Sequence, residues 1–398
     1  MLDGFDASLY AYVLVSSLAE LLPASGIAAN EANIGLYGGM LFSVFMVGWA
    51  ASIFWGWAAD RYGRVSILCW TVLFYSVFTA ASGLATGIAS FAMFRFLTGF
   101  GIGGEWGAGT PLLQEGVPEQ KRVLLAGWLH TAIPVGFLLA ALVVMMAGDM
   151  LGWRGVFLVG ILPALLILYV RLAFSVPMRR ETASRTSKPF AELFRTTRAQ
   201  ATWSSALMLS CAVFGLWSSN FWAPTIVMIK LTAAGATPKH ALQMEALAGI
   251  ATNLGTFVAC LLMPWITTGL GSRRKTAVLF FLGSIASTIA CYELAIEYLH
   301  NIALFFCLLP LLGFFTNGIF SLFTIWLPEL FPTALRGSGS SFAFSSGRLL
   351  GAAGPSIVGL LATATGLPHA ISILAGIYLI GLPFIVISPE TAGRPLPA

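Results

Sequence analysis

Apolar stretches of about 20 residues run through the whole sequence, separated by short polar or Gly/Pro-rich breaks, and this is the length that an α-helix needs to cross a bilayer. The pattern predicts an all-α polytopic membrane protein. Twelve transmembrane helices are predicted, at residues 2–23, 34–58, 65–86, 91–113, 123–147, 156–176, 201–229, 246–266, 277–296, 302–327, 339–362 and 370–387.

Charged residues are too few for a soluble protein. They make up 9% of the 398 residues, and 58% of the residues are hydrophobic, whereas a soluble domain carries about 25% charged residues. No short apolar segment with a small-residue cleavage site opens the chain, so no cleaved signal peptide is predicted. All five cysteines fall in apolar segments, which favours small core residues over a disulfide framework.

The distribution of Lys and Arg predicts the orientation, because these residues favour cytoplasmic loops. Of the 21 basic residues, Arg154, Lys230 and Lys239 fall in predicted outer loops. Arg95 and Arg348 fall within spans, and the others lie at inner ends if both termini are inside. We therefore predict a multi-pass protein of the inner (plasma) membrane with cytoplasmic N and C termini. The net charge of +5 follows from this topology and indicates no nucleic-acid partner.

The longest predicted inner loop divides the chain into halves. Residues 177–200 are basic and polar and leave six spans on each side. The predicted domains are an N-terminal six-helix bundle at 1–176, a cytoplasmic central loop at 177–200, and a C-terminal six-helix bundle at 201–398. The motif "FAELF" in the loop is consistent with an amphipathic helix on the membrane surface.

The two halves resemble each other at an offset of 214 residues. The Glu, Pro and Arg of "QEGVPEQKR" recur at the same spacing in "PELFPTALR", and Gly99 and Gly104 match Gly313 and Gly318. Two duplicated six-helix halves are typical of a carrier with a central site between them. The alternative is a chance recurrence of glycines and basic helix ends.

A group of charges lies between the second and third predicted spans, in "GWAADRYGR". This segment resembles the inner-loop signature of the major facilitator superfamily. A degenerate copy, "GLGSRRK", keeps the basic residues but lacks the acid. The resemblance implies a charged gate that favours the outward-open state; the alternative is that the arginines only fix topology. The gating candidates are Gly56, Asp60, Arg61, Gly63, Arg64, Glu115, Arg122, Glu329 and Arg336.

Three further segments, "MLDGFDASLYAYVL", "RFLTGFGIGGEWGAGTPLLQEGVPEQKR" and "LPELFPTALRGSG", resemble the organic-acid branch of that superfamily, which includes sialate, lactate and aromatic-acid proton symporters. The first span begins next to Met1, whereas such relatives carry a cytoplasmic tail before it. Either the tail is dispensable or the sequence begins inside the protein.

Ionisable residues inside predicted spans are functional candidates, because their burial is costly. Asp3 and Asp6 share a helix face, and two buried carboxylates raise each other's proton affinity. The intrinsic titration of a histidine near neutrality makes His130 suitable for a proton relay, and the resemblance links Arg95 to proton coupling. The alternatives are an exposed Asp3, an Arg95 that reaches the outer interface, and structural hydrogen bonds elsewhere. The candidates for proton coupling are Asp3, Asp6, Arg95, Glu105 and His130.

Arg348 is the predicted substrate anchor, because its guanidinium matches a carboxylate and it lies near mid-depth of a span. The only acid found near the second-half spans is Glu293, at an outer end, so its partner must be a first-half acid or the substrate. At the repeat offset Asp6 matches Asn220, which cannot titrate, so protonation is expected in the first half. The other predicted cavity residues are Asn317, Asn253, Trp217, Asn220 and Trp222.

The predicted function is secondary active transport, specifically proton-coupled uptake of a small organic acid by a monomer in contact with membrane lipids. A sugar or other metabolite symporter and an exporter are the alternatives, although the fifth span lacks the Gly-rich pattern of antiporters. A transporter-like sensor or a membrane enzyme is more remote. The sequence contains no phosphate loop and no His, Asp or Glu set with metal-ligand spacing, so neither cofactor nor metal nor enzymatic activity is predicted.

Overall fold

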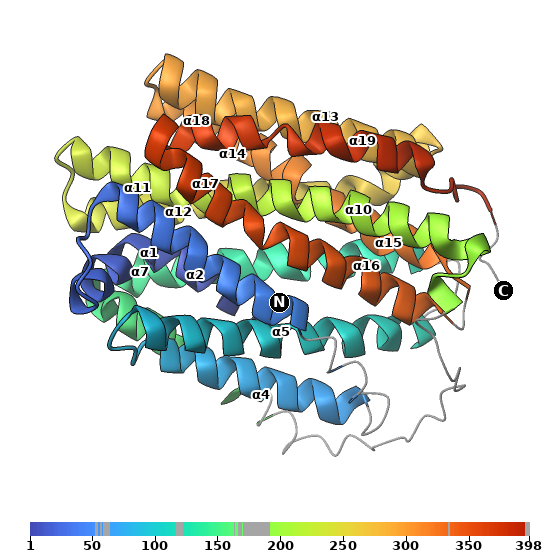
Figure 1. The fold of residues 1–398 in the computed structure, drawn as a ribbon, viewed down its shortest axis with the longest axis horizontal. Helices are drawn as coiled ribbons and strands as arrows, with labels where there is room; N and C mark the ends of the chain where they lie inside the picture. The colour runs from blue at the N-terminus through green and yellow to red at the C-terminus, as the bar shows by residue number, and fades with distance from the viewer. Residues whose placement is uncertain are drawn as a thin grey trace.

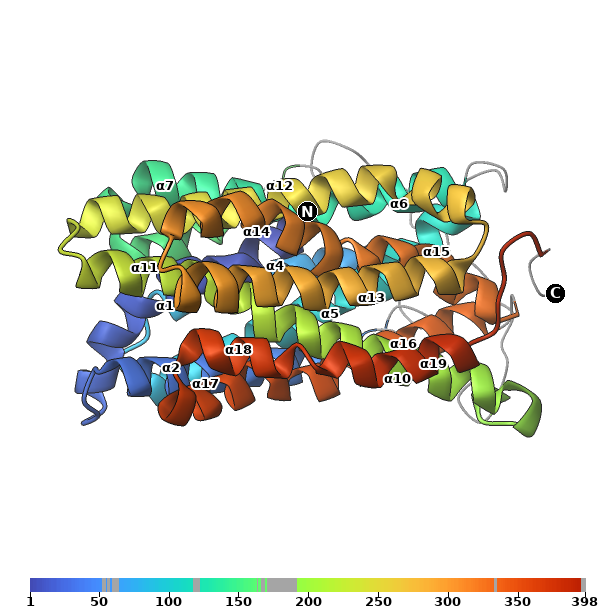
Figure 2. The same ribbon diagram turned by 90° about the horizontal axis from the view of Figure 1, so that it is seen from above.

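The computed structural model describes residues 1–51, 55, 58, 64–116, 122–162, 164–165, 169, 192–332 and 335–394. Within these residues the chain forms helices and no strand. The helices run along the long axis of one bundle, with the C-terminus at one end and the N-terminus about midway along it (Figure 1, Figure 2). The predicted fold class is therefore confirmed.

The first half of the chain contributes six described helices: α1 (Leu2–Ala24), α2 (Glu31–Ala51), α4 (Arg64–Ser82), α5 (Ile88–Gly116), α6 (Arg122–His130) and α7 (Ala132–Val159). The second half contributes the others: α10 (Thr196–Ser219), η2 (Asn220–Trp222), α11 (Ala223–Ala233), α12 (Pro238–Leu270), α13 (Arg273–Ile289), η3 (Ala290–Tyr298), α14 (Ile302–Thr316), α15 (Ile319–Leu330), α16 (Arg336–Gly351), α17 (Ala353–Thr365), α18 (Leu367–Leu374) and α19 (Ile377–Ile387).

Most predicted spans have a counterpart. Nine helical stretches of the described residues are long and apolar enough to cross a membrane, and Ser66–Ser82 and Ile88–Gly104 are shorter apolar helices. About half of the predicted sixth span, 156–176, lies outside the described residues. Two boundaries were wrong. Helix α7 continues to Val159 across a kink at Gly152 (φ 61°), and the eighth span begins at Pro238 rather than at 246.

Helix starts in the second half follow local capping rules. Thr237 precedes Pro238 and accepts a hydrogen bond from the His240 N–H at 3.3 Å, and Ser272 and Asn301 cap α13 and α14 in the same way. A hydroxyl or amide side chain at this position satisfies an N–H that the helix leaves unpaired, and proline is favoured at the first helical position. These caps set where the helices begin.

The two halves repeat one close helix contact. A Cβ added at Gly99 of α5 would overlap the carbonyl of Phe45 on α2, and one at Gly313 of α14 would overlap the carbonyl of Thr252 on α12. Gly48 on α2 and Gly255 on α12 complete both pairs, against the carbonyls of Phe96 and Pro310. Since Gly99 and Gly313 were matched by the 214-residue offset, the repeat extends to three-dimensional packing.

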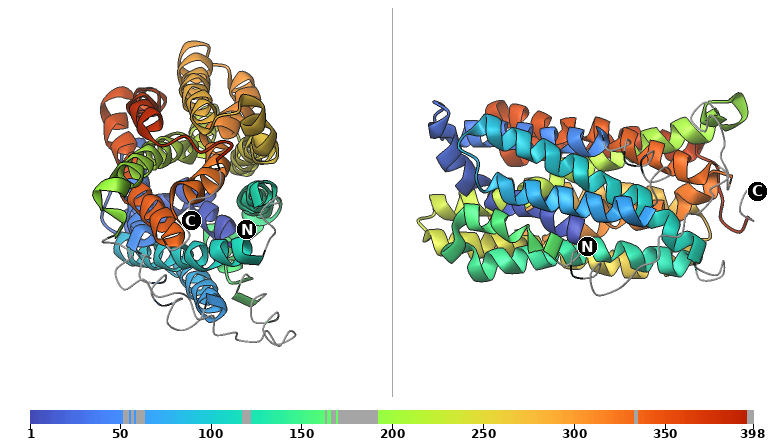
Figure 3. Two further views of the ribbon diagram at one scale, coloured as in Figure 1. Left: turned by 90° about the vertical axis from the view of Figure 1, so that its right-hand side faces the viewer. Right: turned by 90° about the horizontal axis from the view of Figure 1, so that it is seen from below.

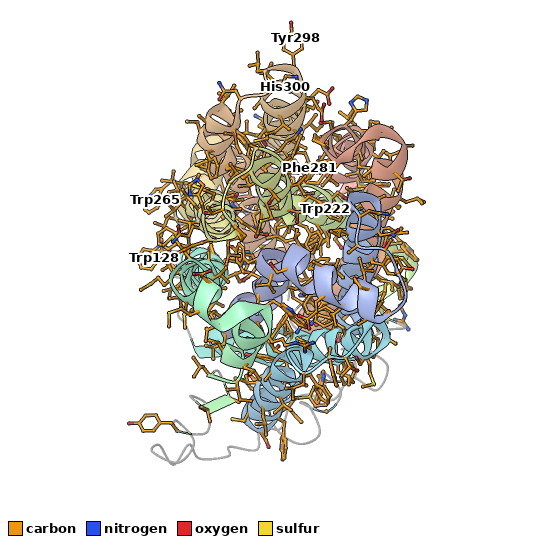
Figure 4. The ribbon with its side chains drawn as sticks, turned by 90° about the vertical axis from the view of Figure 1, so that its left-hand side faces the viewer. Trp128, Trp222, Trp265, Phe281, Tyr298 and His300 are labelled. Atoms are coloured by element: carbon orange, nitrogen blue, oxygen red, sulfur yellow. The ribbon has the colours of Figure 1, made fainter. Side chains whose placement is uncertain are left out.

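Viewed along the bundle, the first-half helices gather on one side and the second-half helices on the other (Figure 3). The halves meet where α2 packs against α17 and α7 against α12. Trp128, Trp265 and Tyr298 point outward, whereas Phe281 and Trp222 are buried inside (Figure 4). We call the end that holds the starts of α13 and α16 and the last residue of α19 the basic end.

Candidate functional site

A cavity of about 130 Å³ is lined by side chains from both halves of the bundle. Its walls are mainly apolar and aromatic. The ionisable side chains that line it are Asp3, Tyr12, His130 and Arg348. A mostly apolar cavity with a few convergent polar groups is typical of a small-molecule site.

Helix breaks bring polar groups to this cavity. Helix α6 ends at His130, α10 ends beside Asn220, and α14 ends beside Asn317, and all three side chains line the cavity. Arg348 lies in the last turn of α16, just before the break at Ala352. Discontinuous helices around a central site are typical of secondary transporters.

Arg348 lies among aromatic rings. Its side chain is buried, and its guanidinium carbon lies 4.5 Å from the centroid of Trp49 and 5.5 Å from that of Phe344. No described residue forms a hydrogen bond or a salt bridge with the guanidinium, although the charge of Asp3 acts on it. The hydrogen-bonding capacity of Arg348 toward an anion is therefore available in this conformation. The sequence did not predict the contribution of Trp49.

Asp3 and His130 lie at the same cavity. Asp3 is 4% exposed, so it is not the exposed residue of the alternative interpretation, and it accepts a hydrogen bond from the Met1 amino group at 2.9 Å. His130 Nδ1 lies 3.2 Å from the Thr324 hydroxyl on α15, in the other half. The charge of Asp3 acts on His130 as well as on Arg348. Helices α1, α6 and α16 thus bring three predicted residues together.

Arg95 and Asp6 form a second group, inside the first half. Arg95 is 1% exposed and does not reach the outer surface. Its Nε and Nη2 donate to the Ser82 hydroxyl at 3.2 and 2.9 Å, and the Phe157 ring centroid lies 4.7 Å from its guanidinium carbon. Asp6 is fully buried, and its charge acts on Arg95. Neither residue lines the cavity.

The predicted amide and aromatic residues are divided. Asn253, Asn317, Asn220 and Trp217 line the cavity. The Oδ1 atoms of Asn253 and Asn220 are buried and have no hydrogen-bond partner among the described residues. Trp222 does not line the cavity: it is fully buried, and its ring packs against that of Phe221, which also packs against Phe42. Adjacent helical residues point to different faces, and sequence alone did not separate them.

Part of the predicted gate lies outside the described residues, namely Gly56, Asp60, Arg61 and Gly63. For a further set only the backbone is described: Arg64 begins α4, Glu115 is in α5, Arg122 begins α6 and Arg336 begins α16. Glu105 is likewise placed in α5 without a described side chain.

Glu329 is the member of the predicted gate whose side chain is described, and it belongs to an ionic network at the basic end. Its carboxylate accepts hydrogen bonds from Arg273 Nε and Nη2 at 3.1 and 2.9 Å and from the Thr391 hydroxyl. Glu390 accepts from the Ser272 hydroxyl and from the N–H groups of Arg273 and Arg274, at the first turn of α13. The segment "GLGSRRK" contains no acid of its own, and Glu390, which follows α19, provides a carboxylate next to it.

The environment of Glu390 determines its ionisation. Burial opposes the charged form, but the hydrogen bonds from Ser272 and from three backbone N–H groups outweigh it and lower the pKa of Glu390 to about 2. The dipole of α13 favours a carboxylate at this position as well. The sequence analysis missed Glu390 because it lies after the last span.

Glu245 was also missed. It is 1% exposed and lies inside α12, so the statement that no acid other than Glu293 lies near the second-half spans was wrong. The Thr237–Pro238 pair is a helix-start signal. A span predicted to begin there, rather than at residue 246, would have included Glu245.

Comparison with known proteins shows what the chain resembles. Residues 1–268 match the family model described as Major Facilitator Superfamily, and residues 173–398 match one described as Sugar (and other) transporter. A metabolite transport protein of Haemophilus influenzae is 29% identical, over 99% of this chain and 95% of its own length.

Two further relatives carry more specific descriptions. The sialic acid transporter NanX of Escherichia coli is 29% identical over 89% of this chain and 82% of its own length. The cis,cis-muconate transport protein of Acinetobacter baylyi is 27% identical over 96% of this chain and 89% of its own length.

Proposed function

The chain belongs to the major facilitator superfamily and is a transporter rather than an enzyme, and from this premise we propose that it takes up a small organic acid together with protons. Uptake proceeds by alternating access of the central cavity. The proposed domains are the bundles 1–176 and 201–398 with the loop 177–200 between them.

The observation that carries this proposal is Arg348. A buried guanidinium is disfavoured unless an anion pairs with it, and this one lines a cavity with no hydrogen-bond or salt-bridge partner among the described residues. A carboxylate can accept two parallel hydrogen bonds from its planar fork. Arg348 therefore anchors the carboxylate of the substrate.

The cavity walls favour a substrate with a flat or apolar skeleton. Phe42, Trp217 and Phe221 line the cavity, and the ring centroid of Phe42 lies 4.7 Å from that of Trp217 and 4.3 Å from that of Phe221. Trp49 covers the guanidinium of the anchor. The amide side chains of Asn253 and Asn220, which line the cavity, accept hydrogen bonds from substrate hydroxyl groups. Sialic acid and muconate, which the names of two relatives contain, are both organic acids.

Asp3 couples the proton to the substrate. Because its charge acts on both Arg348 and His130, an ionised Asp3 competes with the substrate carboxylate for the anchor. Protonation of Asp3 removes this competition, so that substrate and proton bind together. The Asp6–Arg95 group provides a second titrating carboxylate in the same half, and Glu105 remains a candidate.

The basic end, where the chain ends, faces the cytoplasm in this proposal, and the N-terminus, which lies about midway along the bundle, is proposed to open to the same side of the plasma membrane. The pair of Arg273 and Glu329, at 2.9 Å, then closes one half of the inner gate. The segment from Gly56 to Arg64, with Glu115, Arg122 and Arg336, forms the other part.

Uptake by purified protein in proteoliposomes tests the proposal. With an imposed inward proton gradient, a panel of carboxylates and sugars should yield accumulation of a carboxylate, and a protonophore should abolish it. Accumulation of a sugar, or transport driven only outward, would instead favour the sugar symporter or the exporter.

The anchor is tested by binding to folded variants. Arg348→Lys keeps the charge but loses the bidentate fork, so the dissociation constant for the carboxylate should rise on the order of tenfold. Arg348→Ala should lose acidic substrates, and Lys230→Ala, an exposed control, should bind like the unmodified protein. Unchanged carboxylate affinity in folded Arg348→Ala would exclude the anchor.

A further inference from the structure

Glu245 is a buried acid with no role in the proposed mechanism. It lies in the second half, in the third turn of α12, and is 1% exposed. Neither carboxylate oxygen has a hydrogen-bond partner among the described residues. An ionised carboxylate in such a place is strongly disfavoured, and the group takes up a proton instead. A structural acid would have hydrogen-bond donors around it, so burial of this kind indicates another role.

A contact between the halves lies close to Glu245. One turn further along α12, a Cβ added at Gly249 would overlap the ring of Tyr12 from α1. Tyr12 and Gly249 both line the central cavity, whereas Glu245 does not. Glu245 therefore lies one turn behind the wall that Tyr12 forms with Gly249. Helix α1 departs from helical geometry at Val13, next to this contact.

No salt bridge to Glu245 is found among the described charged residues near it. Asp149 of α7 is paired with Lys239 of α12 at 3.4 Å, and Lys230 of α11 is exposed. The ionisable group whose interaction with the Glu245 charge is resolved is Tyr12, a phenol that is neutral at physiological pH. Among the described residues, no cation forms a salt bridge with Glu245.

We propose that Glu245 is a proton-loading site that must be protonated before the Tyr12–Gly249 contact between the halves can close. When the contact is open, water reaches the carboxylate, which binds one proton from it; closure then buries the neutral acid. When the contact opens again, the proton returns to water. This inference rests on the proposed proton-coupled function and adds a second-half acid to it.

Glu245→Gln tests the proposal, because the amide imitates the protonated acid. The two cysteines that are not buried, Cys69 and Cys307, are first changed to serine. A cysteine is then introduced at Ser8, a cavity-lining residue of α1. Labelling by a membrane-impermeant maleimide is followed from pH 6 to pH 9 in intact cells and in inverted vesicles. No substrate is needed.

With Glu245 present, the labelling rate from one side should rise with pH as the contact opens, by up to about tenfold per pH unit for a one-proton step. Glu245→Gln should label slowly at every pH. Dividing the labelling rate of the parent by that of Glu245→Gln at the same pH removes the pH dependence of the reaction of the thiol itself. Glu297→Gln, at an acid of η3 that does not line the cavity, should behave like the parent.

The melting temperature is a second measurement, which does not depend on labelling of the cysteine. The melting temperature of the purified parent should fall between pH 7 and pH 9 relative to that of Glu245→Gln, because only the parent must bury an acid that tends to ionise. Equal pH profiles of labelling and of melting in the two proteins would overturn the inference. If uptake showed no proton coupling while these profiles differed, the proposed function would be wrong. The control of the Tyr12–Gly249 contact by Glu245 would still be supported.

Discussion

Two pairs of buried ionisable residues join different helices among the described residues. Asp6 of α1 acts on Arg95 of α5, and Asp3 of α1 acts on Arg348 of α16. A buried ion costs several kcal/mol when its partner is removed. A proton that neutralises one aspartate therefore changes the free energy of the arginine opposite, which is what coupling between a proton and a substrate anion requires.

Glu390 gives a residue-scale prediction at the basic end, outside the spans. Glu390→Gln should lower the melting temperature of the purified protein at pH 7, because hydrogen bonds to a charged acceptor are stronger than those to an amide, with a loss on the order of 1 kcal/mol.

The pH dependence follows from the depressed pKa of about 2. The stabilisation by the folded, ionised carboxylate is complete above the ordinary pKa of about 4.3, and it is lost as the pH falls toward 2. The difference in melting temperature between the parent and Glu390→Gln should therefore shrink over this window. A difference that stays constant down to pH 3 would contradict the assignment. Glu297→Gln, a glutamate at the opposite end, is the control.

At the scale of helices, close glycine contacts hold corresponding pairs together, α2 with α5 and α12 with α14. Hydrophobic burial provides little force between helices in lipid, so small residues that let backbones approach are important there. The same device in both halves explains why the repeat is visible in the sequence.

Replacement of these glycines should separate the helices. Gly99→Ala and Gly313→Ala should each destabilise the protein by about 1–3 kcal/mol, the usual effect of overpacking. Gly269→Ala, in α12 with no atom within 4 Å of the added Cβ, should be neutral or slightly stabilising. Melting temperatures of the purified variants in detergent check this. Equal melting temperatures for Gly99→Ala and Gly269→Ala would show that the contact is not tight.

At the scale of the whole molecule, the halves meet along α2 and α17. The Ser43 hydroxyl bonds to the Ala352 carbonyl and lies 2.7 Å from the Ser356 hydroxyl. At the far end from the basic end, Lys239 of α12 and Asp149 of α7 also join the halves. Alternating access requires the halves to move relative to each other, so such contacts must change during the cycle.

A disulfide across this seam should stop transport. The double variant Ser43→Cys/Ser356→Cys places two thiols where the hydroxyl oxygens lie 2.7 Å apart, so the two sulfur atoms are expected to be within reach of each other. Oxidation should reduce uptake into proteoliposomes at least about tenfold, and a reductant should restore it. Each single variant should be unaffected by the oxidant. Full uptake by the cross-linked protein would mean that α2 and α17 move as one body.

The sequence by itself determined the helical class, the approximate spans and the internal repeat. A segment in lipid must satisfy its own backbone hydrogen bonds, so its length and apolar character decide its structure locally. Arg95, Asp3 and Arg348 stood out for the same reason, since a charge within an apolar stretch is visible without any knowledge of its neighbours.

Only the tertiary structure decided which of these groups meet. Asp3 and Arg348 lie near opposite ends of the chain, and Glu390 reaches the first turn of α13 from beyond α19. It also separated Trp217, which lines the cavity, from Trp222, which does not, and it buried Glu245 close enough to Tyr12 for the two side chains to interact. Each of these facts depends on which face of one helix contacts another, and contacts between helices are set by packing across the whole bundle rather than by the pattern of any one segment.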